Sequence, residues 1–187
     1  GVMANHFPWI AEFRLRKMIP CEQALQLDVQ AEAATLYAGM DTFVVAQKGT
    51  LASIDLPPNP GFEAAEAARE KYLGFRYKFE YDQCYVCSPK RPNDGMCIHA
   101  GPTGVPGIYA ASWIPERYML NEQGSVANEF IYAALDCPGA YAAMGDQVNA
   151  MLLGSFTVEV TGSLKAGDRC VIVAWESGRD GRRRYAH

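Results

Sequence analysis

The sequence predicts an α+β fold in which antiparallel strands surround one long buried helix, and three observations predict it. The stretch 128–143 is apolar on nearly every side, as expected for a helix buried all round. Short segments of alternating apolar and polar residues occur on both sides of this stretch, which is the pattern of antiparallel strands. The order of one helix followed by three or four such segments occurs twice, so we expect two similar units in tandem.

The composition limits the classes of function. The chain has 187 residues, and 49% hydrophobic with 20% charged residues is ordinary for a domain with a real core. A net charge of −4 argues against a nucleic-acid surface. No run of about 18 apolar residues is present and the start does not resemble a signal peptide, so we expect no membrane span. Six cysteines without the spacing of a small disulfide scaffold favour a reducing, cytoplasmic location.

The first half of the chain is expected to hold a helix and an antiparallel meander. Residues 4–18 carry apolar side chains at helical spacing after Asn5, which suits a cap, and Pro20 ends the segment. A surface helix is expected at 62–73 because its residues favour helices. Strands are expected at 24–30, 33–37, 42–47 and 51–56.

The second half is expected to repeat this order around the central helix. Strands are expected at 96–100, 108–112, 152–161, 170–176 and 182–187. No strand precedes the first helix, and the last strand has no onward partner. We therefore expect the units 1–75 and 76–187 to be incomplete at their outer ends or to be completed by a second chain. Exposed sheet edges favour pairing, so a homodimer or higher homo-oligomer is expected.

One acid, Asp136, lies in the apolar central helix and is followed by Cys137 and Pro138. A buried carboxylate either finds partners or takes up a proton, which makes Asp136 a functional-site candidate. Pro138 lacks an N–H and is expected to break or kink the helix. Asp136 therefore lies either on the helix or at the cap of a second helix. A structural alternative is a carboxylate bonded to backbone N–H groups freed around Pro138.

The densest group of potential metal ligands consists of Cys84, Cys87, Cys97 and His99. Thiolates and imidazole suit tetrahedral zinc, and C-x-x-C is a moderately specific spacing for it. The later pair is spaced C-x-H rather than C-x-x-C, however, which weakens the case for a metal site. Cys137 has no histidine near it in the sequence and is expected to act as a small buried hydrophobe rather than a nucleophile.

Several motifs resemble those of a family of bacterial thioesterase-like hot-dog proteins. They are CYVCSP at 84–89, NDGMCI at 93–98, WIP at 113–115, AALDCPG at 133–139, GSFTVEV at 154–160 and KAGD at 165–168. The resemblance covers nearly the whole chain and is stronger in 84–187 than in 1–75. It implies a double hot-dog fold, similar to the acyl-CoA thioesterase II group, in which each unit wraps an antiparallel sheet around a central helix.

The resemblance implies hydrolysis of an acyl-CoA or related thioester without a resident cofactor. Carried over by position, Asp136 activates water or attacks the thioester. Asn5 and His6 fall in the facing loop, where backbone N–H groups hold the carbonyl oxygen. A helix cap for Asn5 and a surface position for His6 are the simpler interpretations.

Two departures from the family motifs bear on the function. His6 and Phe7 stand where the family has two glycines, and Ser88 replaces the glycine after the second cysteine. The first departure favours an alternative function, a module that binds an acyl or aromatic molecule without turnover. Hydratase chemistry also uses this fold, but no histidine follows Asp136 at a suitable distance. The activity therefore depends on family analogy and one acid.

Overall fold

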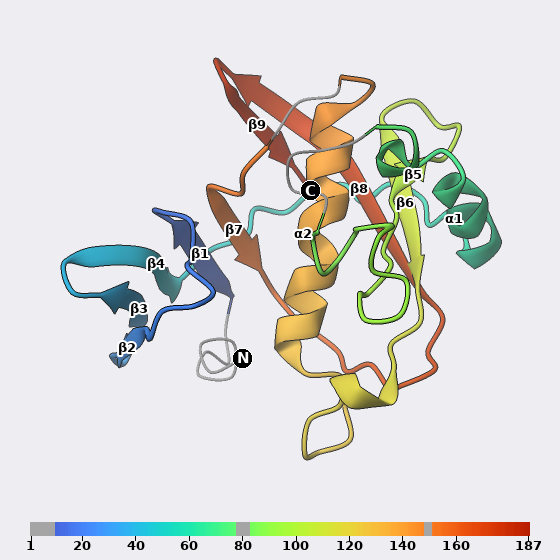
Figure 1. Ribbon diagram of the computed structural model, residues 1–187. Helices are drawn as coiled ribbons and strands as arrows, with labels where there is room; N and C mark the ends of the chain where they lie inside the picture. Colours follow the sequence, from blue (N-terminus) through green and yellow to red (C-terminus); the bar gives the residue numbers. More distant parts are fainter. Residues whose placement is uncertain (1–9, 78–82, 148–150) are drawn as a thin grey trace. The chain divides into compact units, whose positions relative to one another are not determined.

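A computed structural model describes residues 10–77, 83–147 and 151–187, and its elements are labelled in Figure 1. The chain divides into two compact units. Unit 1 comprises Gly1–Ile54 and Leu152–Ser163, and unit 2 comprises Asp55–Met151 and Leu164–His187. The incompleteness expected of the sequence units 1–75 and 76–187 stays a prediction. Among the described residues, neither helix has both the length and the apolar character that a membrane span requires.

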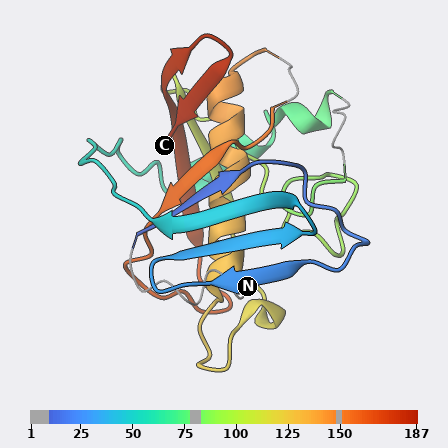
Figure 2. The ribbon, with the colours of Figure 1, turned by 90° about the vertical axis from the view of Figure 1, so that its left-hand side faces the viewer.

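Unit 1 is a five-stranded antiparallel sheet, whose strands lie side by side in Figure 2. The order is β2-β3-β4-β1-β7, and the small side chains of Ala11, Ala34 and Ala46 are buried in it. The strands are β1 (Ala11–Leu15), β2 (Gln26–Val29), β3 (Ala33–Ala38), β4 (Asp41–Lys48) and β7 (Ser155–Val158). The predictions for β2, β3, β4 and β7 are confirmed. The strand predicted at 51–56 does not form.

The helix predicted at 4–18 is wrong where the structure describes it. Ala11–Leu15 form β1, which pairs with β4 on one side and with β7 on the other. In this segment, apolar residues alternate with charged ones at Ala11, Phe13 and Leu15. The pattern therefore fits a strand as well as a helix. Two neighbouring strands satisfy its backbone groups, and this pairing outweighs the local helical spacing.

Unit 2 combines a four-stranded antiparallel sheet of order β5-β6-β8-β9 with two helices. Its strands are β5 (Gly101–Pro102), β6 (Ile108–Trp113), β8 (Cys170–Asp180) and β9 (Arg183–Ala186). The helices are α1 (Phe62–Arg69) and α2 (Asn128–Met144). Figure 1 shows α2 running along β8, while α1 packs on β5 and β6. The predictions for α1, α2, β6, β8 and β9 are confirmed, but residues 96–100 form no strand.

The predicted fold class is wrong. The chain does not form two tandem units that each wrap a sheet around a long central helix. The described residues form separate antiparallel sheets of five and four strands, with α-helices of eight and 17 residues. Both helices belong to unit 2. The segment expected to supply the first central helix is strand β1 in its described part, so the double hot-dog assignment is wrong.

Helix α2 continues through Pro138 instead of breaking there. Its bounds agree with the prediction, and Ala127 occupies the N-cap position. Pro138 is buried inside the helix, and Gly145, at φ 61°, ends it. Asp136 therefore lies on the helix itself, which decides between the two placements that the sequence left open.

Candidate functional site

Three cysteine side chains from two elements meet in unit 2. Cys84 and Cys87 come from the loop before β5, and Cys137 comes from the middle of α2. The three Sγ atoms all lie within 4.8 Å of one another, and the Sγ atoms of Cys84 and Cys137 are 3.6 Å apart. Cys87 is buried and the other two are half-buried. All three are free thiols, so the cluster is available for thiol chemistry.

Backbone hydrogen bonds fold the cysteine loop into a tight turn. The Ser88 N–H donates to the Cys84 carbonyl at 3.0 Å, which brings the two ends of the C-x-x-C segment together. Farther along the loop, the Met96 N–H donates to the Tyr85 carbonyl at 2.8 Å. The Ile98 N–H donates to the Val86 carbonyl at 2.9 Å. The loop is thus fixed at several points around the two cysteines.

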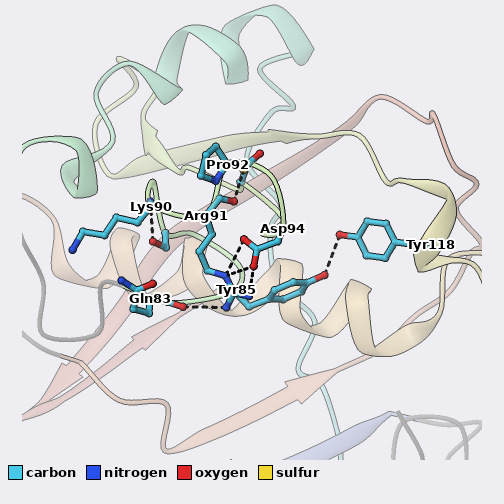
Figure 3. Close-up of polar contacts among 9 residues, drawn as sticks. Gln83, Tyr85, Lys90, Arg91, Pro92, Asp94 and Tyr118 are labelled. Carbon is cyan, nitrogen blue, oxygen red and sulfur yellow. Dashed lines mark hydrogen bonds and ion pairs between the residues drawn. The ribbon is translucent and has the colours of Figure 1, made fainter.

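Side chains brace the same loop from outside, as Figure 3 shows. The Arg91 guanidinium donates to the Asp94 carboxylate at 2.7 Å and to the Gln83 carbonyl at 3.4 Å. The Tyr85 hydroxyl lies 3.0 Å from the Tyr118 hydroxyl. These contacts hold both the start and the tip of the loop, so the positions of Cys84 and Cys87 are built into the fold.

Two tyrosines border the cluster on its buried side. The Tyr72 hydroxyl donates to the Cys87 carbonyl at 2.8 Å and lies 2.6 Å from the Tyr141 hydroxyl. With the Tyr72 proton directed to that carbonyl, the Tyr141 hydroxyl donates to the Tyr72 oxygen. The Tyr141 oxygen lies 3.9 Å from Cys87 Sγ. Burial raises the pKa of Tyr72 far above its usual value, so this network stays protonated.

The thiols of the cluster differ in their pKa values. Hydrogen bonds from Cys137 and then from Cys87 hold the pKa of the Cys84 thiol well below its usual value. The hydrogen bond with Cys84 is the main cause that raises the pKa of Cys137. The hydrogen bond with Cys87 and burial raise it further. Of these two thiols, Cys84 therefore loses its proton more readily than Cys137.

Asp136 lies beside the cluster as a half-buried carboxylate. Burial, and secondarily the charge of Cys84, raises the pKa of Asp136 to about 6. Within the described residues, no hydrogen bond or ion pair engages this carboxylate, including from the backbone around Pro138. The structural alternative, in which backbone N–H groups freed around Pro138 bind the carboxylate, is therefore wrong for the described residues. Asp136 is left available for a ligand or for water.

The sequence predicted only part of this arrangement. Of the four potential zinc ligands, the structure brings Cys84 and Cys87 together but places Cys97 and His99 elsewhere. Cys97 Sγ donates to the Arg91 carbonyl at 3.6 Å, and the His99 ring packs between other rings. Cys137 takes their place, although the sequence indicated only a buried hydrophobe. Its position within the most apolar helix gives no sign of which loop it meets.

The other two predicted site residues, Asn5 and His6, lie outside the described residues. Their expected role in holding a carbonyl oxygen stays a prediction. The structure therefore describes one of the three predicted catalytic residues, Asp136.

An open apolar pocket of about 540 Å³ lies on another side of α2. Helix α2 lines it with Ile131, Ala134 and Leu135, and β8 adds Ile172. Arg169 also lines the pocket, and its guanidinium pairs with Glu63 at 2.6 Å. Leu135 is the immediate chain neighbour of Asp136, but consecutive side chains of a helix point about 100° apart, so the pocket and the carboxylate lie on different sides of α2.

Comparisons with family models, with curated proteins and with solved structures found no match for this chain. The functional argument therefore depends on the residues and their arrangement.

Proposed function

We propose that this chain hydrolyses an acyl-CoA or related acyl thioester, with Asp136 activating the attacking water. The observation that carries the proposal is the half-buried Asp136 carboxylate, which no described residue engages. A carboxylate removed from bulk water is a stronger base toward a bound water molecule. Keeping such a group in an apolar helix costs stability, which is typical of functional sites.

Two further observations support this function. The sequence around Asp136 resembles the helix motif of thioesterase-like proteins, in which an acid occupies this position. The apolar pocket lies against the same helix, includes Leu135, which precedes Asp136 in the chain, and offers about 540 Å³ for an acyl chain. Pockets of this size and character commonly hold small organic ligands.

The proposed reaction uses one carboxylate and one water molecule. Asp136 accepts a proton from water while the water oxygen attacks the thioester carbonyl carbon. Collapse of the tetrahedral intermediate breaks the carbon–sulfur bond. The departing thiolate then takes the proton from Asp136, which returns the carboxylate to its starting state. The products are a carboxylic acid and a free thiol.

A second candidate is a module that binds an acyl or aromatic molecule without turning it over. The pocket favours this alternative, because its lining is mainly apolar and Arg169 is already paired with Glu63. An apolar pocket of this kind needs no catalytic group to hold a ligand.

Incubation with a panel of short, long and aromatic acyl-CoAs tests the proposal and separates the two candidates. We expect saturable hydrolysis of at least one member. Product should be followed by chromatography, because the free thiols of the protein, including exposed Cys21, react with thiol dyes. Saturable binding measured by calorimetry without hydrolysis would replace the enzyme with the binding module. Neither binding nor hydrolysis would contradict both candidates.

A further inference from the structure

We infer that Cys84, Cys87 and Cys137 form a binding site for a thiophilic divalent cation of the Zn²⁺ type. This site goes beyond the proposed hydrolysis and does not depend on it. The evidence is the convergence of three thiols from a loop and a helix that lie about fifty residues apart in the chain. Among the described residues, these three thiols form a group of possible metal ligands whose donor atoms lie close enough together to bind one ion.

The sulfur positions fit a tetrahedral ion. Two thiolates that bind Zn²⁺ at about 2.3 Å in tetrahedral geometry have sulfur atoms about 3.8 Å apart. The Sγ atoms of Cys84 and Cys137 are separated by 3.6 Å, and all three Sγ atoms lie within 4.8 Å. An ion therefore needs only small side-chain adjustments to reach all three sulfur atoms.

The ligand chemistry selects the class of cation. Three sulfur donors suit soft or borderline ions such as Zn²⁺, whereas Ca²⁺ and Mg²⁺ prefer oxygen. The same donors also suit Co²⁺, which makes cobalt a useful spectroscopic probe. Binding requires that the thiols lose their protons, so metal uptake releases protons to the buffer.

The scaffold holds these ligands before any ion arrives. The Ser88–Cys84 backbone bond closes the turn that carries two of them, and the Arg91–Asp94 pair braces the loop (Figure 3). Helix α2 fixes the third. No fourth thiol, imidazole or carboxylate of the described residues joins the group. A site with three protein ligands leaves one tetrahedral position open to water or to an added ligand.

The metal content of the reduced wild-type chain tests the inference. We expect about one zinc per chain by mass spectrometry after purification without chelator. The Cys84→Ser and Cys137→Ser variants should lower this content at least tenfold. Cys97→Ser and Cys170→Ser should keep it, because these thiols lie outside the cluster. Retention by all four variants would overturn the assignment.

A second measurement does not depend on how the variants fold. Metal-free wild-type protein is titrated with Co²⁺, and we expect a thiolate-to-cobalt charge-transfer band that saturates at one equivalent and disappears when Zn²⁺ is added. Absence of this band from reduced, folded protein would contradict the site. A disulfide between Cys84 and Cys137 in protein isolated from cells would also contradict it, because that bond consumes two of the ligands. Asp136→Asn should still bind Co²⁺, which separates this test from that of the hydrolase.

Discussion

Replacement of Gly101 by alanine is expected to destabilise the protein by about 3 kcal/mol or more. Gly101 lies in β5, directly under helix α1. A Cβ atom at this position would lie 1.9 Å from the Ala68 carbonyl oxygen and 2.8 Å from its carbonyl carbon. These are backbone atoms of α1, so relief requires the whole helix to move away from the sheet rather than one side chain to rotate.

The matched control for this substitution is Gly139→Ala. Gly139 lies within α2, and an added Cβ atom would meet only the Ala186 side chain at an ordinary 3.6 Å. Alanine favours a helix interior over glycine, so we expect no loss and a gain of up to about 1 kcal/mol. Urea unfolding followed by circular dichroism gives both free energies. Equal stability of the two variants would mean that α1 does not pack on β5 as described.

The buried imidazole of His99 is expected to make the protein sensitive to acid. His99 is only 3% exposed, and burial, assisted by the charge of Arg69, lowers its pKa from 6.5 to about 4. As the pH falls from 6.5 to 4, the unfolded chain takes up a proton that the folded chain refuses. Stability is therefore complete above pH 6.5 and falls by about 1.4 kcal/mol per pH unit, or about 3 kcal/mol in all.

The measurement is the change in unfolding free energy between pH 6.5 and pH 4, for wild type and for His99→Gln. The variant has lost a buried ring between Tyr72 and Phe75, so its absolute stability is lower at every pH. Its dependence on pH is the informative quantity, and we expect this dependence to be about 3 kcal/mol smaller than that of wild type. The same pH dependence in both proteins would show that His99 titrates normally in the folded state.

The sequence predicted elements well where the local pattern admits one interpretation. Residues 128–143 are apolar on all sides over four turns, and α2 forms there. The alternation of apolar and polar residues in β2 and β7 is equally clear. By contrast, Ala11–Leu15 fit a strand and a helix alike, and the choice was made by pairing with β4 and β7. Those partners lie far along the chain, so local spacing could not identify them, and the fold class was wrong as a result.

The candidate site was predictable in its parts but not in its assembly. An acid in an apolar helix identified Asp136, and C-x-x-C identified Cys84 and Cys87. The third thiol was missed because spacing along the chain pointed to Cys97, only ten residues after Cys87. In the structure, the loop instead contacts Cys137 through Cys84, and these two residues are 53 positions apart in the sequence. Such a contact depends on how α2 packs against the loop, which no local pattern encodes.

The most direct test of the central claim compares hydrolysis by wild type, Asp136→Asn and Asp180→Asn on the acyl-CoA that the panel shows to be the best substrate. Asp180 is an exposed acid at the end of β8, so its variant makes the same change of charge away from the site. We expect Asp136→Asn to lose at least about 100-fold in turnover, as for removal of a general base, with its circular dichroism unchanged. Asp180→Asn should keep the wild-type rate. Equal turnover in all three proteins would contradict Asp136 as the group that activates water.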